Sequence, residues 1–315
     1  MQMAAWLSDF VPPPPVPGEL IEELRDQLTR VATEVCAPLD PSALPLRVPK
    51  SRLADLERCE RTAVARSRES GPQEPMSDAG LRGVALDRFV THQLVAGRVL
   101  EPVAALRSML EAEAEWQPLD ALAQMGEAHA AELIDPLATS VADSWSGIDP
   151  AWAPRTQSRA MVVLADGAAV CSGVIDVELG GPSTTMPSVM VEVKSGRPVS
   201  SHQSEAYLYG LLVALRDRIA PAAVARWYPG GAPAVLPVSV GMLESAALRL
   251  EASLMRWAEL IGGATPVETP GVWCRWCIDA PNCPSASIGL SIGASPAGTF
   301  DASELGAEHD ASADN

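Results

Sequence analysis

The sequence predicts a mixed α/β fold, in which a central sheet is flanked by helices. Three features indicate this class. Apolar residues recur at helical spacing through most of the first 147 residues. Strand-like runs follow over 161–195, and helical patterns return over 201–219 and 241–260. With 315 residues, of which 47% are hydrophobic, the chain can bury a full core.

The N-terminal part is expected to be helical after a proline-rich start. Four consecutive prolines, Pro12 to Pro15, cannot form a helix, so residues 1–17 are predicted to be a flexible, extended arm. A first helix is expected over 19–35. A second should begin near Ser51, because serine often caps a helix.

A long helical stretch should follow a polar loop at 70–79. Residues from Gly80 to Ser144 have a helical pattern almost throughout, and breaks are expected at Pro102, Pro118 and Pro136. We interpret about 80–147 as a helical insertion ahead of a catalytic core at about 155–240.

The catalytic core should contain the strands. Met161 to Leu164 and Ala169 to Leu179 form a predicted hairpin around the Asp166-Gly167 turn, and Val189 to Ser195 form a third strand. Two short strands are expected at 224–228 and 234–238. A cysteine cluster at 271–286 closes the domain that begins at residue 18. The tail, 287–315, is small, acidic and predicted to be disordered.

The net charge of −17 argues against a protein that coats nucleic acid through a generally basic surface. A local basic groove remains compatible with that charge, and its candidate residues are Arg155, Arg159, Arg197, Arg216 and Arg218. The chain has no apolar run long enough to cross a membrane, and its N-terminus lacks the regions of a secretory signal. We therefore expect a cytoplasmic protein without a membrane partner.

Two acidic residues and one lysine are the main catalytic candidates. Glu192 and Lys194 alternate with valines on a predicted strand, so both should point to the same face. Asp176, on the preceding strand, can join them if the two strands are antiparallel. Carboxylates that meet at one point favour a hard divalent cation such as Mg²⁺ or Mn²⁺, and the set suits phosphodiester hydrolysis. The alternative is an exposed strand face with an ordinary salt bridge.

The next helix carries Gln203 and Tyr207, four residues apart and therefore on one helical face; Tyr209 is interpreted as a core residue. The order Gly-x-Ile-Asp, Val-Glu-Val-Lys-Ser-Gly, Gln-x-x-x-Tyr resembles the RecB-type branch of the PD-(D/E)XK nucleases. This resemblance implies a restriction-endonuclease-like fold. It implies a metal held by Asp176, Glu192 and the Val193 carbonyl, catalysis by Lys194, and a site lined by Gln203 and Tyr207. Asp87 stands where this branch has a histidine ligand, and could bind the metal instead.

Three of the six cysteines crowd into ten residues, which suggests a metal or cluster site. Cys274, Cys277 and Cys283 are one thiolate short of a closed site, and Cys59 is the candidate fourth. Cys59 on a Ser-x-Leu-led helix, together with Cys-x2-Cys-x5-Cys, resembles the iron–sulfur RecB-like nucleases, which include the AddB nuclease domain and CRISPR-associated exonucleases. The resemblance implies a [4Fe–4S] cluster. Zinc is the alternative, because four thiolates suit it too.

These features predict a metal-dependent DNA nuclease, and the resemblance implies an exonuclease on single strands or DNA ends. The alternative is a non-catalytic nucleic-acid-binding or assembly subunit that retains the fold; RNA is a further possible substrate. The chain lacks a Gly-x-x-x-x-Gly-Lys-Ser/Thr loop, so any unwinding requires a partner such as a helicase. Repair and phage defence both remain open as pathways.

Overall fold

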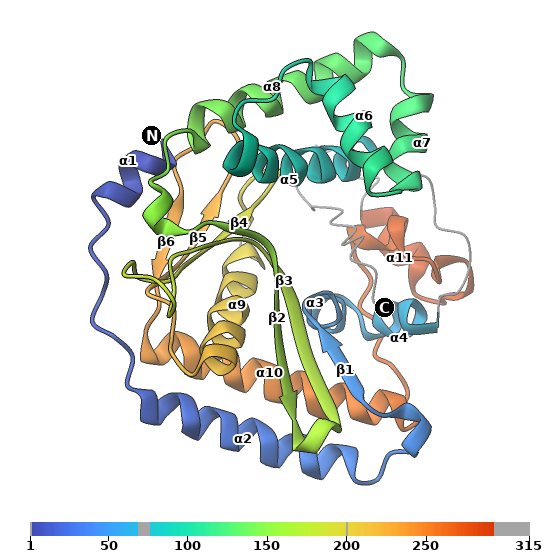
Figure 1. Cartoon of the computed structure of the whole chain (residues 1–315). Coiled ribbons are helices and arrows are strands. Elements are labelled where there is room, and N and C mark those ends of the chain that lie inside the picture. The colour runs from blue at the N-terminus through green and yellow to red at the C-terminus, as the bar shows by residue number, and fades with distance from the viewer. Residues whose placement is uncertain (1, 69–75, 200, 293–315) are drawn as a thin grey trace.

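The computed structural model describes residues 2–68, 76–199 and 201–292. Its centre is a six-stranded mixed sheet with helices on both faces, so the predicted fold class is confirmed (Figure 1). The strands are β1 (Leu46–Pro49), β2 (Arg155–Leu164), β3 (Ala169–Leu179), β4 (Val189–Val193), β5 (Ala223–Trp227) and β6 (Ala234–Pro237). Their order is β1-β3-β4-β5-β6, and β2 also pairs with β3. The β1–β3 and β4–β5 pairs are parallel, and the others are antiparallel.

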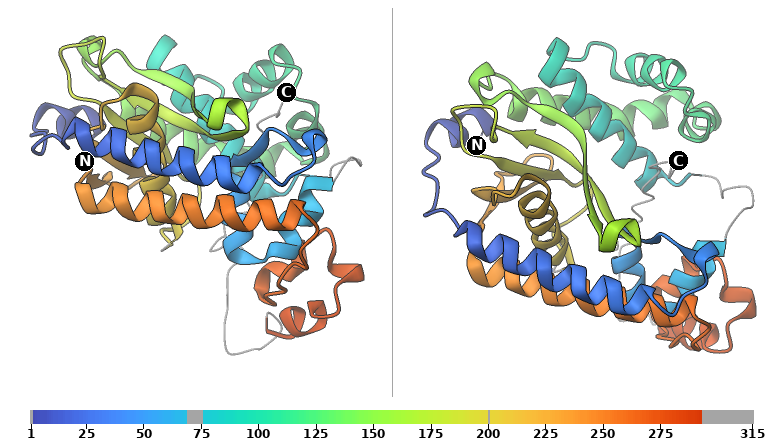
Figure 2. Two further views of the ribbon diagram at one scale, coloured as in Figure 1. Left: turned by 90° about the horizontal axis from the view of Figure 1, so that it is seen from below. Right: turned by 60° about the horizontal axis from the view of Figure 1, so that its bottom comes forward.

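Three helices cover one face of the sheet: α2 (Gly18–Cys36), α9 (Ser201–Asp217) and α10 (Val240–Ile261). The long helices α2 and α10 lie side by side beneath α9, as Figure 2 shows. Their leucines and alanines repeat every three or four residues and pack against residues of β2 and β3 such as Val162 and Cys171. Cys171 is fully buried, and this burial raises the pKa of its thiol to about 12.

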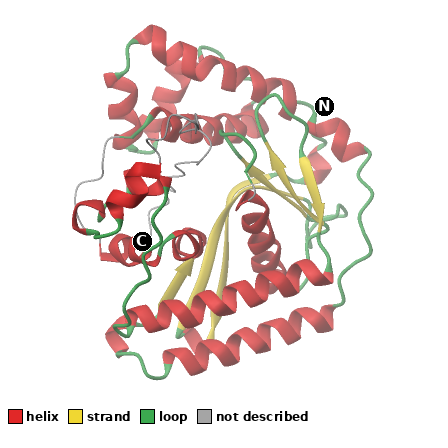
Figure 3. Ribbon diagram, turned by 180° about the vertical axis from the view of Figure 1, so that it is seen from behind, coloured by secondary structure: helices red, strands yellow, loops and turns green. Residues whose placement is uncertain are grey.

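The opposite face is covered by α5 (Asp78–Ala96), α6 (Pro102–Ala112), α7 (Trp116–Gln124) and α8 (Glu127–Trp145). Figure 3 shows these helices and the α2/α10 pair on opposite sides of the sheet. Val189, Val191 and Val193 all point to this face and are buried, as their alternation predicts. Trp145 of α8 meets Trp227 of β5 edge to face, with ring centroids 5.6 Å apart.

Most expected elements occur within a few residues of their predicted bounds. The structure differs from these expectations in several places. The Asp166-Gly167 turn is part of a short 3-10 helix, η3 (Ala165–Gly167). Pro136 lies inside α8 and does not end it. Strand β1 was not expected, because four residues are too few for a periodic pattern; η1 (Pro41–Ala43) precedes it.

Near both ends of the described part, helices form where the sequence predicts none. Residues Met3–Ser8 form helix α1, whose Met3 and Leu7 are buried against the α5–α8 layer, so the prediction of an extended arm is wrong there. At the other end, Ala286–Ile292 form α11, so the prediction of disorder is wrong for 287–292; residues 293–315 lie outside the described part.

The remaining elements link the helical layers to the cysteine cluster. Helices α3 (Lys50–Arg58) and α4 (Glu60–Arg68) follow β1, and they replace the single helix expected from Ser51. Short 3-10 helices occur at η2 (Pro150–Trp152), η4 (Val272–Trp276) and η5 (Ala280–Asn282). Among the described helices, none combines the length and the apolar character that a membrane span requires.

Candidate functional site

A cavity of about 680 Å³, here called the central cavity, lies where β3 and β4 approach α5. Its charged and polar lining includes Lys50, Asp87, Asp176, Glu192, Lys194, Arg197, His202, Tyr209 and Tyr228. The three main candidates, Asp176, Glu192 and Lys194, are therefore brought together. Asp87 lines the same cavity from α5, and Val193 lines it from β4.

Asp176 reaches the cavity at the point where β3 and β4 separate. The antiparallel pairing of β3 and β4 extends only from Leu179/Val189 to Val177/Val191. Beyond that point, the Asp176 side chain bonds to the backbone of β4 in place of the β3 backbone. Its Oδ2 accepts a hydrogen bond of 2.6 Å from Val193 N. On the β2 side, the ladder skips Gln157, which has a positive φ of 51°. The fold thus holds this carboxylate between diverging strands.

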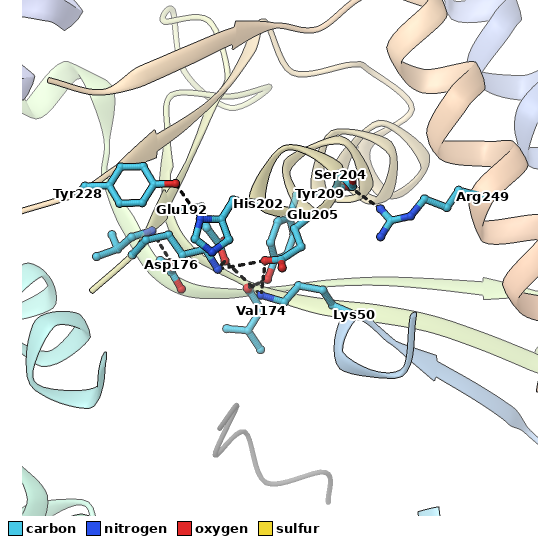
Figure 4. A network of polar contacts seen from close by, with 12 residues as sticks. Lys50, Val174, Asp176, Glu192, His202, Ser204, Glu205, Tyr209, Tyr228 and Arg249 are labelled. Carbon is cyan, nitrogen blue, oxygen red and sulfur yellow. Dashed lines mark hydrogen bonds and ion pairs between the residues drawn. The ribbon is translucent and has the colours of Figure 1, made fainter. Parts of the chain in front are cut away.

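Glu192 and Lys194 belong to a buried group of four alternating charges, here called the ion quartet: Lys50, Glu192, Lys194 and Glu205. Lys194 Nζ lies 2.9 Å from Glu192 Oε1 and 3.0 Å from Glu205 Oε2. Lys50 Nζ lies 3.1 Å from Glu192 Oε1 and 3.6 Å from Glu205 Oε2. Figure 4 shows Lys50 and Glu205 converging on Glu192 from α3 and α9.

The two oxygens of Glu192 have different surroundings. Oε1 accepts from both lysines, whereas Oε2 is buried and has no hydrogen-bond partner among the described residues. A buried carboxylate oxygen without a partner is costly, unless a cation or another donor binds it. The donor chemistry at Glu192 therefore fits a hard divalent cation.

Asp176 is the most perturbed acid of this site. Burial raises the pKa of its carboxyl well above the ordinary value, and the negative charges of Glu192 and Asp87 raise it further. Lys194 and the Val193 N–H act in the opposite direction. Burial also works to raise the pKa of Glu205, but Lys194 and Lys50 outweigh it and the net shift is downward. The negative charges of Glu192 and Asp87 thus both act on the Asp176 carboxyl.

Gln203 and Tyr207 are not among the residues that line the central cavity. Gln203 is exposed, and its Nε2 donates to Tyr207 Oη at 2.8 Å on the outer side of α9. The neighbouring residue His202 lines the cavity instead, and its Nδ1 lies 2.8 Å from Tyr228 Oη. Tyr209, interpreted from the sequence as a core residue, is buried but also lines the cavity.

The five arginines expected to form a basic groove do not gather at the central cavity. Arg155 and Arg216 bind the two oxygens of the buried Glu178, each at 2.8 Å, and Arg218 pairs with Glu22. Arg159 is exposed on β2, away from the central cavity. Of the five predicted arginines, only Arg197 lines the cavity. For Arg155, Arg216 and Arg218, ion pairs with acidic residues of the same chain explain why these arginines do not form the groove.

The second candidate site contains Cys59, Cys274, Cys277 and Cys283, which line one small cavity, as the sequence predicts. Cys59 lies between α3 and α4 in extended backbone, which directs it toward the C-terminal cysteines. The sulfurs have polar neighbours: Cys59 Sγ donates to Val267 O at 4.0 Å, Gly271 N donates to Cys274 Sγ at 3.5 Å, and Thr62 Oγ1 lies 3.3 Å from Cys277 Sγ. Cys36 is buried elsewhere, where its thiol donates to Ala168 O.

Ion pairs reinforce the junction around these cysteines. Arg61, two residues after Cys59, binds Asp279 at 2.6 Å and Glu268 at 2.7 Å. Glu60 accepts two hydrogen bonds from Arg256 of α10, at 2.7 and 2.6 Å, and a third from Val267 N. The N-terminal helix pair and the C-terminal segment are thus joined by side chains about 200 residues apart in sequence.

No family model matches the sequence, and no curated protein matches it. Among solved structures, the chain is similar to a "putative exonuclease" from Eubacterium rectale, with 13% identity over 76% of this chain and 89% of that one, and a TM-score of 0.49. It is also similar to SSO0001, with 16% identity over 65% of this chain and 96% of that one, and a TM-score of 0.32. The residue assignments therefore rest on the contacts described above.

Proposed function

We propose that this protein is a metal-dependent nuclease that hydrolyses phosphodiester bonds of DNA in the central cavity. The observation that carries the proposal is the difference between the surroundings of the two carboxylate oxygens of Glu192. Two lysines hold its Oε1, while Oε2 is buried without a partner beside the Asp176 carboxyl.

The residues that would hold Mg²⁺ or Mn²⁺ are Asp176, Glu192, Asp87 and the Val193 carbonyl. A cation bound there polarises a phosphate and lowers the pKa of a bound water. Lys194 lies beside Glu192, where its ammonium can orient the attacking water or stabilise charge that develops on the phosphate oxygens. His202 and Tyr228 line the same cavity and offer hydrogen bonds to a phosphate or sugar.

A cavity of about 680 Å³ falls within the usual size of a ligand pocket, and a duplex is far wider than such a pocket. We therefore propose single strands or DNA ends as the substrate. The rival function is a non-catalytic subunit that retains the fold. It is favoured by the net charge of −17 and by the ion pairs that occupy Arg155, Arg216 and Arg218.

We also propose that the four cysteines hold a metal centre, a [4Fe–4S] cluster or, as the alternative, Zn²⁺. Four thiols line one cavity, and a set of four thiolate donors suits either group. The Gly271 N–H and the Thr62 hydroxyl can stabilise thiolates. The absorption spectrum and metal content of anaerobically purified protein distinguish the two. Cys59→Ser should lose bound metal, whereas Cys36→Ser, a matched change at a buried thiol outside the site, should retain it.

The proposed activity can be tested with matched single strands of DNA and RNA, each end-labelled and incubated with Mn²⁺ or Mg²⁺. Cleavage of DNA in preference to RNA supports the proposal, and a product ladder that grows from one end supports an exonuclease. If the protein binds DNA but cleaves neither strand while its cysteine site is loaded with metal, the non-catalytic function is the better conclusion.

A further inference from the structure

The chain contains only two lysines, and both belong to the ion quartet. Its 23 basic residues comprise 21 arginines and the lysines Lys50 and Lys194. Lys194 is the lysine of the proposed catalytic motif. Lys50 lies 144 residues earlier, yet its Nζ is 3.1 Å from the same Glu192 Oε1 that Lys194 contacts. A chain that uses arginine at every other cationic position therefore places both lysines against one carboxylate oxygen.

Lysine and arginine are not equivalent in such a place. An ammonium group is compact and donates in three directions, whereas a guanidinium is a wide, planar fork. In the quartet, each lysine lies between Glu192 and Glu205, and the two lysine side chains are only 9% and 2% exposed. Two guanidinium groups would occupy more space around Oε1. The geometry thus accounts for the use of lysine at position 50.

The fold fixes Lys50 from several sides. Strand β1 pairs in parallel with β3 up to Pro49/Ser172, and Lys50 is the first residue of α3, so its backbone leaves the sheet beside the site. Its ammonium lies 5.2 Å from the centre of the Tyr209 ring. Tyr209 is itself anchored, because its hydroxyl donates to Val174 O at 2.5 Å.

The side chain of Arg249 joins the helices that carry residues of the ion quartet. Arg249 of α10 donates to Ser204 O of α9 at 2.7 Å (Figure 4). It also donates to Glu57 of α3 at 2.6 Å. Residues Ser204 and Glu205 are adjacent, and Glu57 lies on the helix that begins at Lys50. Arg249 therefore bridges the two helices that supply Lys50 and Glu205.

We propose that Lys50 is a positioning residue of the active centre, a role that rests on the proposed nuclease function. Lys50 holds Glu192 Oε1, which leaves Oε2 as the oxygen for the cation. Lys50 and Lys194 both contact the carboxylates of Glu192 and Glu205. Lys50 and Glu205 together therefore fix the position of the Lys194 ammonium. Removal of Lys50 should impair the chemical step at saturating metal, because Glu192 and Lys194 lose their fixed positions.

The two-lysine composition permits a direct structural test. Protein labelled with ¹³C-lysine has two lysine side chains to observe, and Lys50→Met leaves only that of Lys194. Paramagnetic Mn²⁺ should broaden both signals of the wild type over the same concentration range. In Lys50→Met, the remaining Lys194 signal should move from its wild-type frequency, which a merely structural role far from Lys194 would not cause.

Activity provides the second readout. Lys50→Met should lower kcat at saturating Mn²⁺ by about 10- to 100-fold. Arg47→Met is the matched control, since it removes one positive charge from an exposed position of β1 and should cleave like the wild type. If Lys50→Met folds poorly, the double variant Lys50→Met/Glu205→Gln can be used, because it restores the charge balance of the ion quartet. This double variant should still cleave DNA slowly.

The outcomes separate this inference from the proposed function. If the wild type cleaves DNA and a folded Lys50→Met protein has a kcat within about twofold of it, with the Lys194 signal unmoved, the role of Lys50 is refuted and the nuclease stands. If the wild type cleaves nothing and Mn²⁺ broadens neither lysine signal, the proposed metal site itself is wrong, and the inference loses its basis.

Discussion

The ammonium of Lys50 lies 3.1 Å from Glu192 Oε1, although the two residues are 142 positions apart in sequence. This pair connects the beginning of α3 to the end of β4. The same helix α3 ends at Arg58, one residue before Cys59, so a single helix of nine residues extends from the central cavity to the cysteine cavity. Both candidate sites thus depend on how α3 packs against the sheet.

Asp176→Asn should abolish the stabilisation that Mn²⁺ confers. A ligand at 100 times its Kd stabilises a folded protein by about 2.7 kcal/mol, and this gain requires the Asp176 carboxylate. Thermal unfolding with and without Mn²⁺ measures it. Asp166→Asn, an exposed turn position with the same chemical change, should keep the full shift.

The stabilisation of the folded protein by Mn²⁺ should increase as the pH rises. The pKa of Asp176 is raised by burial, Glu192 and Asp87, so the folded, metal-free protein retains this proton above the ordinary range of an aspartate. A raised carboxyl pKa means that the metal-free fold loses stability as pH rises toward that pKa, while the cation gains a ligand. An Mn²⁺ shift independent of pH would contradict this role of Asp176.

Gly173→Ala should destabilise the protein by about 1–3 kcal/mol, as overpacking of a core does. A methyl group at Gly173 would lie 2.8 Å from Tyr209 Cε1, and the hydrogen bond from Tyr209 to Val174 O limits how far the ring can move. Urea unfolding measures the loss. Gly83→Ala is the control, because its added methyl meets only Ser195 Oγ at 3.8 Å.

Gln203→Ala should leave cleavage within about threefold of the wild type, whereas Tyr228→Phe should lower kcat/KM by about tenfold, the worth of one hydrogen bond. Gln203 and Tyr207 bond to each other outside the central cavity, whereas Tyr228 Oη bonds to His202 within it. Steady-state kinetics on single-stranded DNA test this. The opposite ranking would favour the arrangement implied by the sequence motif over the one in the structure.

Glu60→Gln should weaken the protein by about 1.5–3 kcal/mol near neutral pH, because hydrogen bonds to a charged group are lost. The hydrogen bonds from Arg256 are the main cause that lowers the pKa of Glu60. A lowered folded pKa gives stability that is present above the unfolded value and lost as pH falls through the folded one. The gap between wild type and Glu60→Gln should therefore close in acid.

The control for that experiment is Glu259→Gln. Glu259 also binds Arg256, at 2.6 Å, but its side chain is 57% exposed, so water screens the pair. We expect a change of at most about 0.5 kcal/mol. Equal losses from the two variants would show that the Glu60 contacts do not hold α4 to α10.

The sequence was sufficient to predict the convergence of Asp176, Glu192 and Lys194. The alternation of valines defines the faces of β4, and β3 precedes it closely enough for an antiparallel pair. The four cysteines could also be grouped, because the ligand spacing of Cys274, Cys277 and Cys283 leaves one place for an upstream thiol.

The side of α9 that faces the cavity could not be predicted. Residues 202, 205 and 209 share one helical face at spacings of three and four, and that face carries His202, Glu205 and Tyr209 to the site. Gln203 and Tyr207 have equally good helical spacing but lie about 150° around the axis from that face. Periodicity alone does not distinguish two polar faces of a buried helix.

Lys50 was missed for a different reason. Its position depends on β1, a strand of four residues that pairs in parallel with residues more than 120 positions later. Pairing over such a separation leaves no local pattern. The available signal was compositional: a chain with two lysines and 21 arginines has both lysines at the site.

The central claim is that Glu192 and Asp176 support metal-dependent cleavage of DNA. The most direct measurement is single-turnover digestion of end-labelled single-stranded DNA with Mn²⁺, comparing the wild type with Glu192→Gln and with Glu259→Gln as the exposed control. We predict cleavage by the wild type and the control, its loss in Glu192→Gln, and no cleavage when a chelator removes the metal. Cleavage that persists in Glu192→Gln, or that needs no divalent cation, would contradict the claim.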